Sequence, residues 1–169
     1  MLMKQKKVWI TSGAPGSGKS TFVKSLLKEN DVWISRDNIR FSLLGPKDDY
    51  FFKENEVVEK FYNEINKSLE NPNVKNIYID ATHLNASARN KTINAIKSRK
   101  NIKEINCIHF NIPIMECLRR NAMRKGLAFV PVPVVRKMHA SCSLPTKKEG
   151  FDHVYQVDKD NNMKEVNVV

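Results

Sequence analysis

The stretch TSGAPGSGKST, residues 11–21, places three glycines, a lysine and several hydroxyl side chains directly after the apolar run VWI. Within it, Gly13 to Ser20 fit the pattern GxxxxGKS. Glycines let successive backbone amides turn towards an anion, and the N-terminus of a following helix adds its dipole. The lysine supplies a cation, and the serine hydroxyl supplies a ligand for Mg²⁺. This combination predicts a site for phosphate groups bound together with a magnesium ion.

The position of this stretch, between an expected strand and an expected helix, is that of a P-loop. Lys19 would hold the β- and γ-phosphates of ATP, and the Ser20 hydroxyl would bind Mg²⁺. The residues expected to bind ATP are Gly13, Ala14, Pro15, Gly16, Ser17, Gly18, Lys19, Ser20 and Thr21. A chance glycine-rich turn is the alternative, and the coincidence of the full motif with its context disfavours it.

The stretch ISRDNIR places Asp37 just after the next expected strand, between Arg36 and Arg40. An acidic side chain there could face the γ-phosphate across a cleft and accept the proton of an incoming hydroxyl. Because phosphoryl transfer has a loose transition state, such a base need only orient the hydroxyl and take its proton late. Asp37 is therefore the candidate catalytic base. Alternatively, it caps the helix NIRFSLL, and the two roles are compatible.

Asp80 ends the apolar strand within NIYIDATHLN, which is the position of a Walker-B-like acid. It could join the Mg²⁺ shell or anchor an arginine, and it could instead cap the next turn. The residues alone leave these interpretations open. His83, in the same stretch, is interpreted as an incidental polar residue with no assigned role.

Arg120 and Arg124, in CLRRNAMRKG, are four positions apart and therefore share one helical face. They precede Gly126 and the segment VPVP, a pattern that fits a small lid. Two arginines closing over ATP would neutralise charge on the transferring phosphoryl group and exclude water. Together with Lys19 and Asp37, they complete the predicted catalytic set. The alternative is a solvated basic face.

Five apolar runs alternate with longer helical patterns and must position these residues. The runs are KKVWIT, DVWIS, KNIYID, EINCIHFNI and DHVYQVD, and each predicts a strand. The alternation predicts an α/β fold, with a mostly parallel sheet of about five strands and helices on both faces. The first helix is expected at residues 19–30, and a long charged helix at residues 48–71, ended by Pro72. We expect residues 1–169 to form one domain.

The charge balance is strongly basic, with 29 Lys and Arg against 18 Asp and Glu, a net charge of +11 and a pI near 9.6. Such a field attracts polyanions, of which nucleic acid is the natural candidate, although a lysine-rich surface can serve solubility alone. No apolar segment approaches the roughly 20 residues that span a bilayer. MLMKQKK lacks the pattern of a secretory signal. We expect a cytoplasmic protein without a membrane partner, with Cys107, Cys117 and Cys142 reduced.

The segments GAPGSGKST, ISRDNIR, IDATHLN, RRNAMRKG and VPVPVVRKM cover most of the chain. Their order and spacing resemble the kinase domain of phage polynucleotide 5′-hydroxyl kinase. LPTKKEGFD, residues 144–152, further resembles a segment of eukaryotic and bacterial polynucleotide kinases and of the broader P-loop small-kinase family. The resemblance implies a P-loop kinase domain with a small helical lid. It also implies transfer of the γ-phosphate of ATP to the 5′-hydroxyl end of DNA or RNA, in nucleic-acid repair.

The resemblance implies the same roles for Lys19, Ser20, Asp37 and the two lid arginines as those argued above. It adds that Arg40 would contact the phosphate on the 3′ side of the acceptor nucleotide. Asp80 matches the aspartate of a DTN stretch, from which DATH departs in this chain. The residues expected to bind the acceptor are Arg36, Arg40, Asp80 and Thr82.

Two other functions stay open. A P-loop kinase of a small metabolite, nucleoside or antibiotic hydroxyl would share the fold, although the basic charge speaks against it. A nucleotide-gated nucleic-acid-binding module would need no catalytic base, and Asp37 speaks against it. The DxDGT motif of the phage enzyme's phosphatase domain does not occur in the sequence, so we expect no such domain. Asp158 and Asp160, in VDKDNN, predict a solvated turn.

Overall fold

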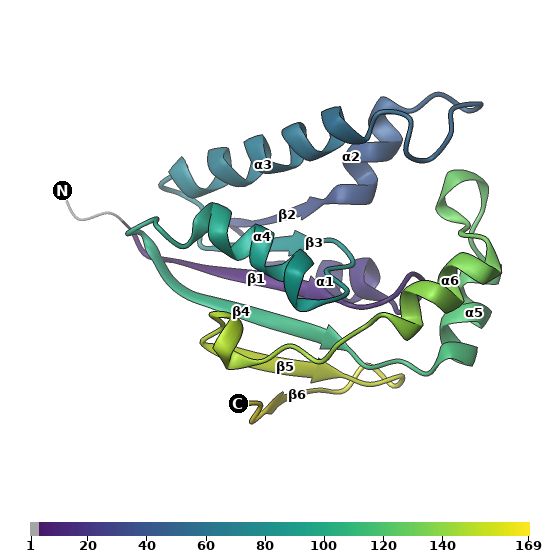
Figure 1. Ribbon diagram of the computed structural model, residues 1–169. Helices are drawn as coiled ribbons and strands as arrows, with labels where there is room; N and C mark the ends of the chain where they lie inside the picture. The colour runs from purple at the N-terminus through teal and green to yellow at the C-terminus, as the bar shows by residue number, and fades with distance from the viewer. Residues whose placement is uncertain (1–3) are drawn as a thin grey trace.

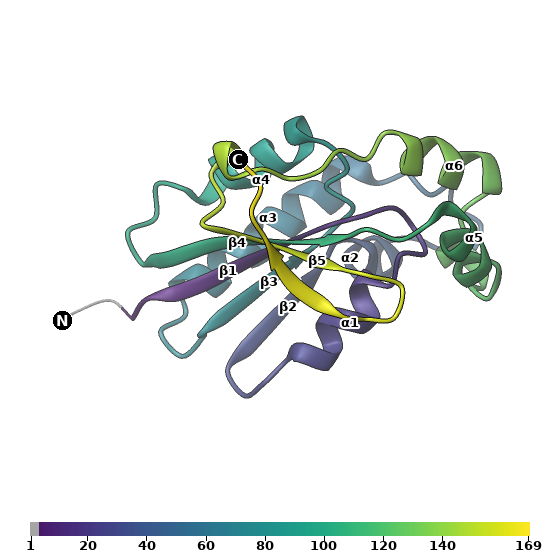
Figure 2. The same cartoon turned by 90° about the horizontal axis from the view of Figure 1, so that it is seen from below.

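The computed structural model describes residues 4–169, which form a six-stranded sheet in the order β2-β3-β1-β4-β5-β6 (Figure 1). The strands are β1 Lys6–Ser12, β2 Asp31–Ser35, β3 Asn76–Asp80, β4 Ile102–Phe110, β5 His153–Val157 and β6 Met163–Val166. Strands β1 to β5 run parallel, and β6 pairs antiparallel with β5 at one edge (Figure 2). The predicted mostly parallel α/β sheet is confirmed.

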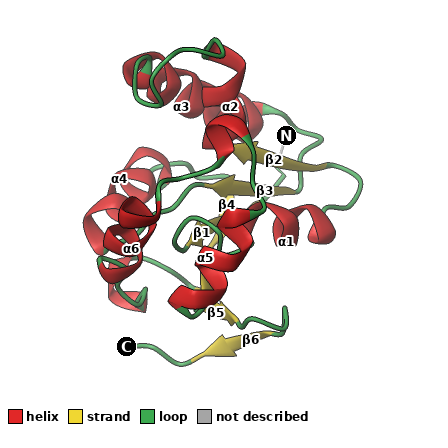
Figure 3. Ribbon diagram, turned by 90° about the vertical axis from the view of Figure 1, so that its right-hand side faces the viewer, coloured by secondary structure: helices red, strands yellow, loops and turns green. Residues whose placement is uncertain are grey.

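Helices cover both faces of this sheet. They are α1 Lys19–Leu26, α2 Arg36–Leu43, α3 Glu54–Glu70, α4 Ala86–Ile96, α5 Ile114–Ala122 and α6 Val132–Ala140, with 3₁₀ helices at Gly126–Ala128 and Lys147–Glu149. Val8 and Ile10 of β1 pack in a core with α3 and α4, whereas Trp9 lies on the face that α1 covers. Figure 3 shows α4 and α1 on opposite sides of the strands. Among residues 4–169, none of the helices has the length and apolarity that a bilayer crossing requires.

Helix α2 begins at Arg36, two residues before the helix predicted as NIRFSLL. Its N-cap is Ser35, whose Oγ accepts a hydrogen bond from the backbone N of Asn38 at 3.1 Å. A serine at this position satisfies one of the free amides of the first turn. Asp37 therefore lies inside the first turn, and the interpretation of Asp37 as the cap is wrong.

The other helix boundaries also differ from the prediction. The helix expected at residues 19–30 ends at Leu26, and the chain turns through Asn30 in a left-handed conformation. The helix expected at residues 48–71 begins only at Glu54. Residues 45–53 form tight turns instead, including a hydrogen bond from the backbone N of Gly45 to Oδ2 of Asp48 at 2.7 Å. Contacts of this segment with α2 override its helical pattern.

Strand β6 was not predicted, because its four residues include Lys164 and Glu165 and lack the apolar run that marks the inner strands. The turn predicted around Asp158 and Asp160 is confirmed as the connection between β5 and β6. Oδ1 of Asp158 accepts hydrogen bonds from the backbone N atoms of Asp160 at 2.9 Å and Asn162 at 3.0 Å.

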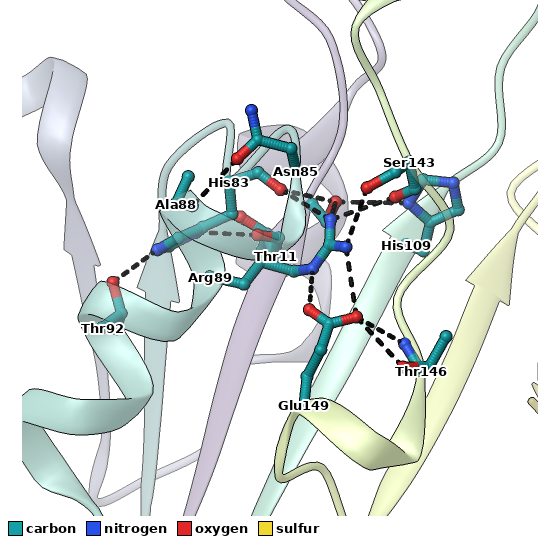
Figure 4. A network of polar contacts seen from close by, with 11 residues as sticks. Thr11, His83, Asn85, Ala88, Arg89, Thr92, His109, Ser143, Thr146 and Glu149 are labelled. Atoms are coloured by element: carbon teal, nitrogen blue, oxygen red, sulfur yellow. Dashed lines mark hydrogen bonds and ion pairs between the residues drawn. The ribbon is translucent and has the colours of Figure 1, made fainter. Parts of the chain in front are cut away.

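A buried ion pair joins α4 to the segment before β5 (Figure 4). Nε of Arg89 contacts Oε1 of Glu149 at 2.6 Å, and the Arg89 side chain is fully buried. Nη1 of Arg89 also donates to the carbonyl oxygens of His83 and Ser143, at 3.1 and 3.0 Å. The His83 ring bridges Thr11 O and Thr92 Oγ1, each at 2.8 Å. His83 is thus a structural residue that holds the end of β1 beside α4.

The carboxyl ends of β1, β2 and β3 meet at one edge of the sheet. The P-loop follows β1, Arg36 follows the last residue of β2, and Asp80 is the last residue of β3, where it pairs with Ser35. Ligands of open α/β sheets bind at this edge. The fold therefore brings the predicted site residues of three separate segments to one place.

Candidate active site

The P-loop has the closely packed backbone that its glycines allow. Gly16 and Gly18 have φ angles of +80° and +88°, in the left-handed region that favours glycine. A Cβ on Gly16 would lie 2.3 Å from the carbonyl oxygen of Cys117, and one on Gly18 would lie 2.8 Å from Nη1 of Arg120. Gly18 is also the N-cap of α1. The loop therefore forms a cradle at a helix N-terminus, which suits a chain of phosphates.

Lys19 turns back over its own loop. Its Nζ donates hydrogen bonds to the carbonyl oxygens of Gly13 and Ala14, both at 2.9 Å. Desolvation at the base of the loop lowers the pKa of the Lys19 ammonium, against the opposing attraction of Asp80 and Asp37.

Asp80 contacts the residue predicted to bind Mg²⁺. Its Oδ2 accepts hydrogen bonds from Ser20 Oγ at 2.7 Å and from Trp33 Nε1 at 2.9 Å. The next helix, α4, is capped by Asn85 instead. Of the interpretations left open for Asp80, the capping role is wrong. Within residues 4–169, its carboxylate accepts hydrogen bonds from Ser20, Trp33 and, at 3.3 Å, Thr11 Oγ1, and from no arginine. The pair Ser20–Asp80 fits a magnesium ion, because both side chains offer oxygen ligands.

The candidate base Asp37 is held by two donors. Nη1 of Arg40 and the hydroxyl of Tyr50 both reach its Oδ1, at 2.8 and 2.6 Å. Within residues 4–169, both of these hydrogen bonds end on Oδ1, and Oδ2 accepts none. Burial, and then the Asp37 carboxylate, raises the pKa of the Tyr50 hydroxyl, so the phenol keeps its proton and remains a donor. One carboxylate oxygen of Asp37 is fixed, and the other is available.

Glu54 holds the two arginines that were predicted to bind the acceptor. Both of its oxygens accept from Nη2 of Arg40, at 2.9 and 2.7 Å, and Oε1 also accepts from Nη2 of Arg36 at 2.6 Å. Burial opposes ionisation of Glu54, but the hydrogen bonds from Arg40 and Arg36 lower its pKa. Within the described residues, the Nε atoms of Arg36 and Arg40 are buried and have no hydrogen-bond partner. Arg40 itself is only 4% exposed.

Arg120 contacts the P-loop directly. Its Nη1 donates to the carbonyl oxygen of Ser17 at 3.0 Å, and its Nε donates to Oε1 of Glu116 at 2.9 Å. Arg124 lines the same cleft, but α5 ends at Ala122, so Arg124 lies in the segment after the helix and the predicted shared helical face is wrong. For Arg120, the alternative of a solvated basic face is wrong, because the guanidinium bridges α5 and the P-loop.

One cleft of about 760 Å³ collects most of the predicted residues. Those that line it are Pro15, Gly16, Gly18, Lys19, Ser20, Thr21, Arg36, Asp37, Arg40, Asp80, Thr82, Arg120 and Arg124. Gly13, Ala14 and Ser17 lie behind this surface, where their polar atoms accept hydrogen bonds from Lys19 or Arg120. The carbonyl of Thr82 accepts from the backbone N of Gly13 at 2.8 Å and so ties the loop to β3.

Tyr50 and Glu54 belong to the site but were not identified from the sequence. Both lie in the stretch read as one continuous charged helix, which hid the loop that carries Tyr50. The available signal was the cluster YFF, three aromatic residues together in an otherwise charged segment. Three adjacent aromatic residues are unexpected on a helix that is exposed to solvent.

The parallel sheet, the phosphate cradle of the P-loop and the Asp37 carboxylate in the same cleft define a P-loop kinase fold. This fold implies nucleotide binding. The chain belongs to the AAA domain family, which matches residues 8–145.

Three solved structures show the same fold at low identity. One, from the Pnkp1/Rnl/Hen1 RNA repair complex, has a TM-score of 0.67 and 23% identity, over 83% of this chain and 45% of that one. A fungal RNA kinase has a TM-score of 0.61 and 16% identity, over 94% and 78% of the two chains. A gluconokinase from Sinorhizobium meliloti 1021 has a TM-score of 0.55 and 15% identity, over 92% and 83%. The chain thus spans less than half of the first of these proteins.

Proposed function

We propose that the protein is a kinase that transfers the γ-phosphate of ATP to the 5′-hydroxyl end of DNA or RNA. Bound ATP would supply the phosphoryl group, and Mg²⁺ would offset the charge of its phosphates. Ser20 and Asp80 would hold the metal ion, and the P-loop amides with Lys19 would hold the phosphates. Arg120 and Arg124 would reach the same phosphates from the lid. A cleft closed by the lid would also keep water from competing with the acceptor.

The observation that carries the proposal is the position of Asp37 in the cleft that the P-loop also lines. Because Arg40 and Tyr50 occupy its Oδ1, the free Oδ2 is the atom that would accept the proton of the attacking hydroxyl. A carboxylate fixed through one oxygen needs no reorientation when the substrate arrives. This is an orienting base of the kind that a loose transition state requires.

Two observations support a nucleic-acid acceptor. The net charge of +11 favours encounter with a polyanion. In addition, among residues 4–169 the buried Nε atoms of Arg36 and Arg40 have no hydrogen-bond partner, and an anionic oxygen could satisfy them after a small movement. Contact of Arg40 with a phosphate on the 3′ side stays a prediction, because that phosphate would have to share Arg40 with Glu54 and Asp37. The RNA repair complex and the RNA kinase among the similar structures are consistent with this class of acceptor.

The second candidate is a kinase of a small metabolite. The ion pairs that hold Arg36 and Arg40 to Glu54 favour it, because these arginines already have a carboxylate partner. The gluconokinase shows that the same fold occurs in a sugar kinase. A nucleotide-gated binding module stays the third candidate, and it requires no phosphoryl transfer.

A transfer assay with radiolabelled ATP separates the three candidates. The acceptors are a 5′-hydroxyl oligonucleotide, a nucleoside 3′-monophosphate, the matching nucleoside and a panel of sugars. A polynucleotide kinase should label the oligonucleotide and should prefer the nucleoside 3′-monophosphate to the nucleoside. Labelling of a sugar or nucleoside alone identifies a metabolite kinase, and labelling of none of them favours the binding module.

A further inference from the structure

Phe51 is a large apolar side chain that the protein leaves in contact with solvent at the mouth of the cleft. It is 67% exposed and lines the cleft, whereas the adjacent Phe52 is 66% exposed and does not line it. Single exposed apolar residues are common on protein surfaces and need no explanation. An exposed aromatic ring at the edge of a reaction site is different, because a substrate can use it.

The ring of Phe51 has a fixed place beside the candidate base. It packs edge-on against Tyr50, with ring centroids 4.8 Å apart and an interplanar angle of 85°. Tyr50 is in turn held under the guanidinium of Arg40, 4.2 Å from the ring centroid, and its hydroxyl donates to Asp37. The backbone carbonyl of Phe51 accepts from the N of Glu54 at 3.2 Å, where α3 begins. The Phe51 ring is therefore attached to the elements that orient the base.

The segment between α5 and α6 and the start of α6, where the sequence predicts a lid, supply further apolar surface to the same cleft. Met123, Phe129 and Val134 line it and are exposed. In Figure 1, the loop before α3 and the loop between α5 and α6 lie at the same end of the molecule, beyond the carboxyl ends of the strands. The cleft thus combines apolar side chains from the loop before α3 and from the region of α5 and α6 with charged groups at its base. A nucleotide, in which a flat base is joined through a sugar to a charged phosphate, matches this combination of apolar and charged groups.

We propose that Phe51 is a stacking platform for a nucleobase of the acceptor strand. This inference rests on the proposed function, whose substrate class it makes specific: an unpaired end, whose bases are free to stack. Stacking on an aromatic ring tolerates any base, because every base has a π-face. Phe51 belongs to the segment that holds Asp37 and not to the P-loop, so it serves the acceptor and not the adenine of ATP.

Steady-state kinetics of Phe51→Ala and Phe52→Ala test the proposal, because the two rings match in exposure and differ in position. Phe51→Ala should raise KM for a single-stranded 5′-hydroxyl oligonucleotide about tenfold, a loss within the range measured for base stacking on aromatic residues. KM for ATP should stay unchanged. Phe51→Trp should keep the wild-type KM, while Phe51→Leu, which keeps apolar area without a π-face, should not. Phe52→Ala should behave as wild type.

Acceptors with one abasic nucleotide identify the base that stacks. If a base stacks on Phe51, removing that base should raise the wild-type KM and abolish the difference between wild type and Phe51→Ala, and removing other bases should not. Equal KM values for Phe51→Ala and Phe52→Ala overturn the proposal, as does a rise confined to KM for ATP. If wild type labels sugars or nucleosides but no oligonucleotide, the proposed function fails and the stacking platform fails with it. Thermal melting should show that all four variants are folded.

Discussion

Arg40 and Tyr50 both donate to Oδ1 of Asp37, so the reactivity of this residue rests on Oδ2. An Asp37→Asn variant can keep an oxygen acceptor for both donors but cannot take up a proton. We expect turnover to fall by about 10²–10⁴-fold, the range for loss of a general base, with ATP affinity retained. Single-turnover transfer and calorimetric titration with ATP measure the two quantities.

Asp49→Asn is the matched control for that variant. Asp49 is exposed on the neighbouring loop and does not line the cleft. Its transfer rate should equal that of wild type. A fully active Asp37→Asn enzyme would show that the base is another group.

Arg119 and Arg120 are adjacent on α5 and both bind Glu116, and their hydrogen bonds lower the pKa of that carboxyl to about 2. Only Arg120 also reaches the P-loop, through Ser17 O. Arg120→Ala should slow transfer by about 10²-fold, because a donor aimed at the developing charge is lost. Arg119→Ala should leave the rate unchanged. If the two variants transfer phosphate at the same rate, Arg120 has only a structural role.

At the scale of helices and strands, the inner strands and the P-loop could be predicted because their signals are local. Apolar runs such as NIYID and the glycine spacing at Gly13, Gly16 and Gly18 need no knowledge of partners. The cap of α2 was harder, because both Ser35 and Asp37 are good capping residues and only the backbone conformation decides between them.

The remainder of the site depends on contacts between segments. The bond between Ser20 and Asp80 joins residues 60 positions apart, and no spacing rule connects them. The role of Glu54 is similar, since it pairs with Arg36 and Arg40 only because the loop at residues 45–53 interrupts the helical pattern. The sequence therefore predicted the candidate site residues Asp37, Arg36 and Arg40 but not Tyr50 and Glu54, which hold them in place.

The buried pair Arg89–Glu149 fastens α4 to the segment before β5, and its loss should destabilise the fold (Figure 4). Arg89→Met leaves the Glu149 carboxylate buried without its cation, at an expected cost of about 3–5 kcal/mol. The control is Arg99→Met, because Arg99 is on the surface and lies 3.8 Å from an exposed Glu70 oxygen. That change should cost about 0–1 kcal/mol. Urea denaturation measures both, and equal losses would contradict the assigned difference.

At the scale of the whole molecule, the pKa values of two buried histidines determine how the free energy of unfolding should depend on pH. Burial lowers the pKa of His83 and of His109 to about 4, below the value of about 6.5 in an unfolded chain. Between these values the unfolded chain binds more protons than the folded one, so stability is present above about pH 6.5 and is lost as pH falls towards 4. The midpoint of urea denaturation should therefore fall as the pH is lowered through this range. A His109→Asn variant should lose part of the slope, and an unchanged slope would remove His109 from this account.

The net charge of +11 should appear in the salt dependence of acceptor binding. Each phosphate contacted on a single strand contributes a slope of about 0.7 in log K against log salt, so a fourfold rise in salt should weaken binding about 2.6-fold per phosphate. The slope of log KM against log salt should therefore grow with acceptor length until added nucleotides extend beyond the protein, and then stay constant. A nucleoside acceptor without phosphate, assayed at the same ATP concentration, removes the contribution of ATP itself. If the slope does not change with acceptor length, the positive charge contacts no strand phosphates and serves solubility, as a metabolite kinase would allow.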